Sequence, residues 1–398
     1  MSIRELTIDE FNAFVRNSPL GTHYQTFNYA LLMGENGYEY ELVGMFNEYN
    51  QLKAASLILF KNLKMRYKYG YAPKGFILDY FNQEIVSEFA TLLKSYYKKK
   101  KVVFIKINPE IAISEIDKES GLKTYNWNYN ILEIMEKAGF KKLKDNLYFE
   151  SILPRFSAVV SLKNYSMNSV SKNTRNKIRR AHHKGLHIEL AEKSGIDILQ
   201  KFIKNKRTIN EYYYKDYYNV FKKDDMIDLF LVSIDSEEFL MNSRELYEKE
   251  LEINNRLVSL LNRENNKRNL NKKMDSDRKI LNYKQDVKFA TELNTKKDKV
   301  YIAGALVIKY QNRIQILMSG YDKKYKSFDA NYYLHDEILK YYQKNYDYAE
   351  LNGLTGDFSK ENPYLGLNEF KIGFNPRIYE YIGEFDLPLN EKKYLKMR

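Results

Sequence analysis

The chain has no cysteine among its 398 residues. This absence excludes disulfide bonds, zinc–thiolate sites, iron–sulfur clusters and cysteine nucleophiles. Histidine is nearly as scarce, with five residues, and none belongs to an HExxH metal-binding pattern. We therefore expect a protein that works with no metal site and no cofactor.

Long apolar runs are missing as well. No stretch approaches the roughly 18 apolar residues that a membrane-spanning helix needs. The charged N-terminal segment MSIRELTIDEF also lacks the apolar core of a signal peptide. The sequence thus predicts a soluble, cytoplasmic protein, for which peripheral contact with a membrane surface stays open.

Proline and glycine are unevenly distributed. No proline lies between Pro154 and Pro363, and no glycine lies between Gly195 and Gly304. Because these two residues interrupt regular structure most strongly, their absence predicts extended helices. We interpret residues 240–297 as an inserted antiparallel helical hairpin, a short coiled-coil arm. Its expected seam consists of Leu246, Ile253, Leu257 and Leu260 in the first helix and Met274, Leu281 and Phe289 in the second.

The remaining sequence shows one order of elements twice. Residues 1–153 predict a first α/β unit of helices, a hairpin and a buried strand. Residues 154–239 and 298–383 predict a second unit of similar order, interrupted by the arm. We therefore expect an α/β (α+β) protein with two tandem domains, duplicated in fold without a clear repeat of residues.

Positive charge exceeds negative charge, with 65 Lys and Arg against 52 Asp and Glu, a net charge of +13. Such an excess attracts polyanions, although compositional drift toward lysine explains it equally well. The polar stretch between the two arm helices concentrates cations beside one acid, Glu264. It predicts contact with nucleic-acid phosphates, and the alternative is an ordinary solvated arm. These cations are Arg263, Lys267, Arg268, Lys272 and Lys273.

Two further basic segments are candidate anion sites. The Pro73-Lys74-Gly75 corner directs backbone amides and one cation outward, which suits a phosphate or a carboxylate. The segment 169–184 predicts a basic helix on which Arg175 lies on a cationic face, suited to gripping phosphates. A structural turn and a solvated helix face are the respective alternatives.

The C-terminal region combines glycines, aromatic residues and a single lysine. Gly353, Gly356 and Asp357 precede Phe370 and Lys371, and the region has too few acids for a metal site. A lysine beside a phenylalanine on a rigid element can present a fixed charge to a developing oxyanion.

In their order along the chain, these motifs resemble the FemABX family of aminoacyl-tRNA-dependent peptidyltransferases, which build the side branches of peptidoglycan. The resemblance covers essentially the whole chain, including the inserted arm. The residues that carry it are Tyr71, Pro73, Lys74, Gly75, Ser171, Arg175, Ile178, Ala181, Gly185, Phe370, Lys371, Gly373, Phe374, Tyr381, Gly383 and Pro388.

The resemblance implies two GNAT-like acetyltransferase-fold domains with the coiled-coil arm, and a return of residues 384–398 to the first domain. It implies that Phe370 and Lys371 lie in the active site, with the lysine stabilising the transition state. Substrate-binding roles are implied for Tyr325 and, in the second domain, for Lys215, Tyr217 or Tyr218.

The implied reaction is transfer of an amino acid from aminoacyl-tRNA to an amine on the stem peptide of a peptidoglycan precursor. Lys371 would face the oxyanion, and Asp357 or a ribose hydroxyl would take the amine proton. The expected partners are aminoacyl-tRNA, not DNA, and either lipid II or UDP-MurNAc-pentapeptide. A lipid-linked acceptor would bring the enzyme to the inner face of the plasma membrane.

Two other functions remain open from the sequence. One is a GNAT-fold N-acyltransferase that uses acyl-CoA, and the other is a non-catalytic RNA-binding protein. Acetyl-CoA-binding domains hold pyrophosphate with a Gln/Arg-x-x-Gly-x-Gly/Ala loop ahead of a helix. The sequence has no such loop, which favours a different acyl donor.

Overall fold

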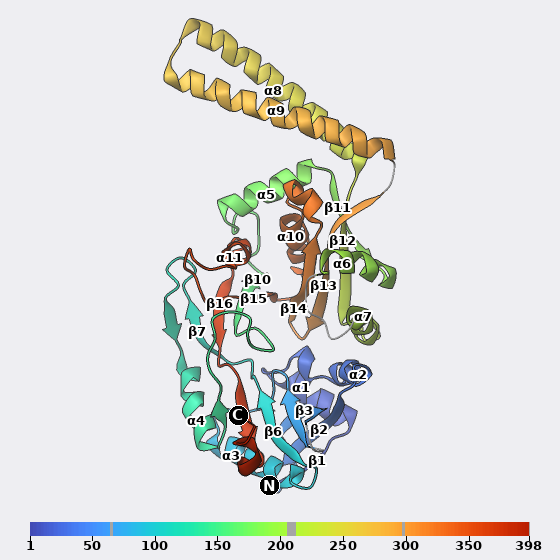
Figure 1. Cartoon of the computed structure of the whole chain (residues 1–398), viewed down its shortest axis with the longest axis vertical. Coiled ribbons are helices and arrows are strands. Elements are labelled where there is room, and N and C mark those ends of the chain that lie inside the picture. The colour runs from blue at the N-terminus through green and yellow to red at the C-terminus, as the bar shows by residue number, and fades with distance from the viewer. Residues whose placement is uncertain (64–66, 205–211, 297–298, 398) are drawn as a thin grey trace.

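A computed structural model describes residues 1–63, 67–204, 212–296 and 299–397. The chain forms two lobes, each built on one β-sheet, and a long helical arm that projects from the second lobe (Figure 1). The expected mixed α/β class is confirmed. Residues 297, 298 and 398, at three of the expected boundaries, lie outside the described ranges.

The first lobe contains a sheet in the order β1-β2-β3-β4-β6-β17-β9, with β5 paired to β3. Its strands are β1 (Ser2–Glu5), β2 (Glu39–Phe46), β3 (Leu52–Asn62), β4 (Lys68–Ala72), β5 (Ile77–Leu78), β6 (Val102–Ile107), β9 (Lys141–Lys142) and β17 (Phe385–Pro388). Its helices are α1 (Ile8–Asn17), η1 (His23–Gln25), α2 (Phe27–Glu35), α3 (Gln83–Tyr97), η3 (Trp127–Asn130), α4 (Ile131–Lys137) and α12 (Glu391–Tyr394).

The second lobe contains a sheet in the order β11-β12-β13-β14-β15-β10-β16-β7-β8. Its strands are β7 (Ala112–Ile116), β8 (Lys123–Tyr125), β10 (Phe156–Ser161), β11 (Leu186–Ala191), β12 (Ile227–Ile234), β13 (Val300–Tyr310), β14 (Arg313–Tyr321), β15 (Tyr348–Leu354) and β16 (Arg377–Tyr381). Its helices are α5 (Lys172–His183), η4 (Lys193–Gly195), α6 (Ile196–Phe202), α7 (Tyr213–Lys222), η5 (Lys323–Phe328), α10 (Ala330–Tyr342) and α11 (Leu365–Ile372).

The two sheets share one pairing pattern. In the first, β2, β3 and β4 pair antiparallel, β4 pairs parallel with β6, and β6 pairs antiparallel with β17. In the second, β12, β13 and β14 pair antiparallel, β14 pairs parallel with β15, and β15 pairs antiparallel with β10. A parallel pair needs a crossover connection, and α3 and α10 supply the two crossovers.

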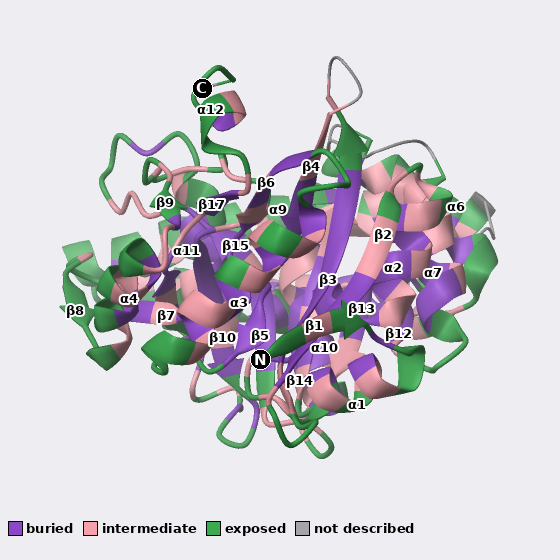
Figure 2. Cartoon of the chain, turned by 90° about the horizontal axis from the view of Figure 1, so that it is seen from below, coloured by how far each residue is buried: buried purple, intermediate pink, exposed green. Residues whose placement is uncertain are grey.

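Helices cover both sheets, and the central strands are therefore buried over most of their length (Figure 2). Strand β3, with the sequence LKAASLILFKN, is buried over seven consecutive residues, as expected for a strand covered on both faces. One apolar core lies beneath α3 and α4, and another joins the second sheet to α5, α10 and α11. The third core lies between the lobes, where α1 and α2 face α6 and α7, and it holds the lobes together.

The division at residue 153 does not follow the sheets. Strands β7 and β8 come before that residue, yet β7 pairs with β16 in the second sheet. In return, β17 follows β16 and pairs with β6 in the first sheet. The two crossing segments lie side by side, and the Ile382 amide donates a hydrogen bond to the Ile111 carbonyl at 2.8 Å. Each lobe thus completes its sheet with a strand from the other part of the chain.

The helical arm consists of α8 (Ser236–Arg263) and α9 (Lys267–Lys296), which lie against each other along their length (Figure 1). The expected seam is wrong at four positions, because Ile253, Leu260, Met274 and Leu281 are exposed. Buried positions along the arm are partly polar, and Asn254 donates hydrogen bonds to Ser276 and Asp277. Apolar spacing alone therefore predicted the wrong residues for the contact between α8 and α9. Among the arm residues whose burial the structure describes, the buried ones are Phe239, Ser243, Glu250, Asn269, Ser276, Ala290 and Leu293.

Gly185 positions the base of the arm. It follows α5 with φ at +62°, a conformation that glycine adopts freely. A Cβ atom there would lie 2.8 Å from the Asp235 carbonyl oxygen and from the Phe239 amide nitrogen. The missing side chain lets α5 end directly against the start of α8. Among the described residues, no helix combines the length and apolar character needed to cross a bilayer.

Candidate active-site cleft

The lobes meet at a buried group of charged side chains. Lys74 follows β4 and Glu110 follows β6, so the first lobe supplies both. Arg313 begins β14 and Glu350 lies on β15, so the second lobe supplies these two. Glu110 reaches the second lobe because it lies where the chain crosses from β6 to β7. The group spans the boundary between the lobes.

Opposite charges are matched within this group. Lys74 Nζ lies 3.7 Å from Glu110 Oε2, and Arg313 forms an ion pair with the same carboxylate. Lys74 also lies over the ring of Tyr381, 4.3 Å from its centre, in the geometry of a cation–π contact. Glu350 accepts a hydrogen bond of 2.6 Å from Ser157 Oγ. A buried charge requires such partners, because burial removes its hydration.

The two glutamates have shifted pKa values in opposite directions. Burial alone would raise the pKa of Glu110, yet Arg313 and Lys74 hold it below its usual range. Burial raises the pKa of Glu350, and the negative charge of Glu110 raises it further. Nearby His23 is buried, and this burial together with the Arg313 charge lowers its pKa to about 3. The cleft thus holds one firmly ionised carboxylate and one that takes up a proton more readily.

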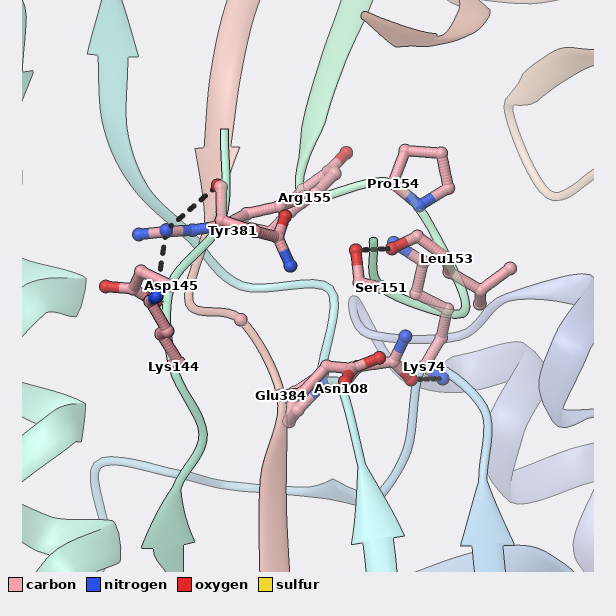
Figure 3. A pocket seen from close by; sticks show the side chains of 13 residues that line it. Lys74, Asn108, Lys144, Asp145, Ser151, Leu153, Pro154, Arg155, Tyr381 and Glu384 are labelled. Carbon is pink, nitrogen blue, oxygen red and sulfur yellow. Dashed lines mark hydrogen bonds and ion pairs between the residues drawn. The ribbon is translucent and has the colours of Figure 1, made fainter. Parts of the chain in front are cut away.

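A small cavity of about 20 Å³ lies beside this group. Figure 3 shows Lys74 and Asn108 at the ends of first-lobe strands, facing Tyr381 and Arg155 of the second lobe. The Lys74 amide donates a hydrogen bond of 2.9 Å to Asn108 Oδ1, which fixes the corner that holds the lysine. The predicted outward Lys74 is therefore an inward, buried side chain.

A much larger groove of about 980 Å³ runs along the second sheet. Arg313 and Tyr381 line it, and both also contact the charged group, Arg313 through Glu110 and Tyr381 through Lys74. On β16 the alternate residues Arg377, Tyr379 and Tyr381 line it, because successive side chains of a strand face opposite sides of the sheet. Its charged and aromatic lining residues are Glu115, Asp117, Lys118, Arg313, Tyr348, Phe374, Arg377, Tyr379 and Tyr381.

Lys371 lies near the end of α11 and is 7% exposed. Its ammonium group donates a hydrogen bond to the carbonyl oxygen of Gly353, near the end of β15. Asn368 ties α11 to the same segment, since it exchanges hydrogen bonds with the Thr355 backbone. The lysine is therefore held near the end of β15 by its contact with Gly353, which lies three residues beyond Glu350.

The two other predicted catalytic residues have structural partners. Phe370 packs edge-on against the rings of Tyr332 and His335, each with its centre 4.8 Å away. Asp357 accepts a hydrogen bond of 2.7 Å from the Tyr148 hydroxyl, which lowers the pKa of this carboxyl. A lowered pKa makes Asp357 a weak proton acceptor.

The predicted substrate-binding residues are spread over the second lobe. Arg175 lies on α5, and Tyr325 packs against Phe289 of the arm at 6.2 Å between ring centres. Lys215 forms an ion pair of 2.6 Å with Asp197 near the surface. The structure does not bring these side chains into one pocket with Lys74.

Tyr217 and Tyr218, also predicted to bind substrate, lie on the face of α7 that enters the core between the lobes. The ring of Tyr217 stacks on Phe221 at 4.8 Å. Both tyrosines are buried, and they belong to the packing that fixes the lobes together.

The predicted RNA-binding cations lie at the far end of the arm. Arg263 ends α8, whereas Lys267 and Arg268 begin α9, and all three are exposed. Lys272 is exposed as well, and Lys273 forms an ion pair of 2.8 Å with Asp277. Because an α-helix rises 1.5 Å per residue, α8 places this tip roughly 40 Å from the base of the arm.

Sequence reasoning missed Glu110, Arg313 and Glu350. Arg313 and Glu110 are 203 residues apart in the chain, and no local motif links them. The only available signal was that Glu110, directly after Pro109, is a charged residue at the end of a predicted buried strand.

The fold and the groove define a two-lobed α/β protein with a large groove lined by charged and aromatic side chains. A sequence profile of the FemAB family matches residues 6–398, and the chain therefore belongs to the FemAB family. The predicted family is confirmed.

Relatives of similar length support this assignment. The chain is 26% identical over 411 residues to a lipid II:glycine glycyltransferase of Staphylococcus epidermidis, covering 99% of this chain and 94% of the relative. It is 25% identical over 413 residues to aminoacyltransferase FemA of the same species, covering 99% and 97%. The crystal structure of FemX shares the fold, with a TM-score of 0.76, 22% identity and full coverage of both chains.

Proposed function

We propose that this protein is an aminoacyltransferase that moves an amino acid from aminoacyl-tRNA to a stem-peptide amine of a peptidoglycan precursor. The observation that carries the proposal is the large groove along the second sheet, in a chain that matches the FemAB family over residues 6–398. Arg313 lines this groove and also forms an ion pair with Glu110, in the charged group with Lys74 and Glu350. One similar protein is named for action on lipid II.

The acceptor occupies the large groove. Its volume of about 980 Å³ lies at the upper end of ligand pockets, which span roughly 300–1,000 Å³. Lys118, Arg313 and Arg377 suit phosphate or carboxylate groups, and the tyrosines offer faces for sugar rings. A precursor linked to lipid would bring the protein into peripheral contact with the inner face of the plasma membrane.

The chemistry needs a proton acceptor and a charge near the ester carbonyl. The amine nitrogen forms a bond to the carbonyl carbon, and the bond to the tRNA ribose oxygen breaks. Glu350 takes the proton that the amine loses and returns it to the departing ribose oxygen. Glu350 suits this role better than Asp357, because the pKa of Glu350 is raised and that of Asp357 is lowered. Lys371 faces the oxyanion after exchanging its Gly353 contact.

The lobes are two GNAT-like domains, and α8 and α9 form a coiled-coil arm inserted in the second. The matching order of pairings in both sheets supports this duplication. The proposed domains are residues 1–153 with 384–398, and residues 154–239 with 298–383, with strands exchanged as described.

The test is incubation of purified full-length protein with charged tRNAs and with either lipid II or UDP-MurNAc-pentapeptide, followed by mass spectrometry of the acceptor. A gain of one amino-acid residue that requires the charged tRNA supports the proposal. Transfer from acyl-CoA without tRNA, or no transfer from any charged tRNA to either acceptor, contradicts it.

A further inference from the structure

Helix α5 carries two cationic stripes with different surroundings. Lys177, Arg180 and Lys184 form the first stripe, and each has a partner within the protein. Lys177 donates to the Tyr332 hydroxyl at 2.7 Å, Arg180 pairs with Asp329 at 2.8 Å, and Lys184 pairs with Asp286 at 3.4 Å. This stripe fastens α5 to α10 and to the arm.

The second stripe consists of Lys172, Arg175 and Arg179, which follow one another at helical spacing on one face. Within the described parts of the chain, no carboxylate lies at ion-pair distance from any of the three, and α5 itself contains no acid. Lys172 and Arg179 are exposed, whereas Arg175 is oriented by contacts of 3.4 Å to the Met167 carbonyl and Asn168. Three adjacent cations repel one another, and a bound polyanion would relieve this repulsion.

This stripe starts beside the groove. The Ser171 amide, just before α5, donates a hydrogen bond of 2.9 Å to the Gly373 carbonyl. Gly373 lies two residues after Lys371, and the next residue, Phe374, lines the groove together with Ser169. At its other end α5 reaches the base of the arm, below α8 (Figure 1). Helix α5 spans about 18 Å from the groove side to the arm, and the stripe from Lys172 to Arg179 covers about 10 Å of that length at the groove end.

The exposed surface of α5 favours nucleic acid over a lipid bilayer. A helix that lies on a membrane exposes large apolar side chains, but Thr174, Ile178 and Ala181 of α5 are buried. Asn173 and Asn176 are exposed between the cations, and such amides donate hydrogen bonds to phosphate and sugar oxygens.

We propose that Lys172, Arg175 and Arg179, the α5 ridge, bind the sugar–phosphate backbone of RNA close to its aminoacylated end. The inference rests on the proposed function for the identity of the RNA. It assigns the main RNA contact to α5 instead of the arm tip, because an ester that reacts in the cleft must come from a strand that enters beside the groove. The tip lies about 40 Å farther away.

The experiment compares two full-length variants that each lose three positive charges. The ridge variant is K172Q/R175Q/R179Q, and the matched tip variant is R263Q/K267Q/R268Q. Binding of unacylated bulk tRNA is measured by fluorescence anisotropy at several salt concentrations, with circular dichroism as the check on folding. Each phosphate contact contributes about 0.9 to the slope of log K against log salt, so three contacts are worth about a hundredfold in affinity at 0.15 M salt.

We expect the ridge variant to bind tRNA about a hundredfold more weakly, with a salt slope smaller by about 2–3, and the tip variant to change less than tenfold. Wild-type binding by the ridge variant, or a larger loss in the tip variant, overturns the inference. So does a ridge variant that loses flotation with phosphatidylglycerol vesicles but keeps tRNA affinity. If tRNA binding depends on the α5 ridge but the wild type transfers no amino acid, the proposed function is refuted and the inference that the ridge binds RNA is kept.

Discussion

Replacing Arg313 by methionine removes a guanidinium group with two partners. This group forms an ion pair with Glu110 across the cleft, and it donates a hydrogen bond of 2.9 Å to the Gly21 carbonyl oxygen. Glu110 is 9% exposed, and its remaining cation, Lys74, is 3.7 Å away. Removing one partner of a buried ion pair costs about 3–5 kcal/mol. An unfolding entropy of about 2.1 cal/mol/K per residue then gives a fall in Tm of about 4–6 °C.

The loss of stability in R313M should depend on pH in a defined direction. The folded pKa of Glu110 is lowered in the wild type, so this group adds stability above its unfolded pKa and loses it as pH falls through the folded pKa. In R313M the main favourable charge is gone and burial dominates, so the folded pKa rises above the unfolded one. The stability of R313M then falls as the pH rises from the unfolded pKa of Glu110 through its folded pKa. The difference in unfolding free energy between the wild type and R313M therefore narrows as the pH falls from 7 to 4.5.

Thermal melts of R313M, E110Q and the double variant measure this coupling, and R377M is the control because Arg377 is an exposed arginine on the same sheet. We expect E110Q to restore most of the stability lost in R313M, since it removes the orphaned charge, and R377M to stay within about 0.5 kcal/mol of the wild type. The reasoning is refuted if R313M melts like R377M, or if its deficit grows toward low pH.

Three further changes test the site and the arm. E350Q keeps the acceptor of the Ser157 hydrogen bond, so we expect an unchanged or higher Tm and a kcat about 10²–10⁴-fold lower; full activity would exclude Glu350 as the proton acceptor. K371M should lower kcat about 10²–10³-fold with little change in tRNA affinity, and an affinity loss without a kcat loss would instead indicate a binding role. G185A forces a Cβ into a contact of 2.8 Å and a positive φ, so we expect destabilisation by about 1–3 kcal/mol in urea unfolding; an unchanged midpoint would contradict it.

Local features of the sequence predicted local structure. The gap in proline and glycine located the two arm helices, because only those residues interrupt a helix so strongly. The hairpin of β2 and β3 followed from two β-rich segments joined by a turn. The seam of the arm was wrong because Ser243, Glu250 and Asn269 are buried there, and an apolar pattern cannot detect a polar contact.

The site was harder to predict because its parts come together only through the exchange of strands. Lys74 was singled out as an anion ligand, but its partner Glu110 and the opposing Arg313 depend on how the chain crosses between lobes. Lys371 and Phe370 were placed by family resemblance, and nothing in their spacing indicates that Lys371 contacts Gly353. Contacts between residues that are far apart in the chain leave no periodic pattern in the sequence.

The exchanged strands bear on how the cleft can work. Each sheet contains a strand from the far side of the crossing, and α1, α2, α6 and α7 share one apolar core between the lobes. Opening the lobes as a hinge would expose that core, which is costly at about 25 cal/mol per Å² of apolar surface. The charged group of Glu110, Arg313 and Glu350 is therefore held in a fixed arrangement. Under the proposed function, substrates enter along the groove and beside α5, and specificity then depends on what those two surfaces bind.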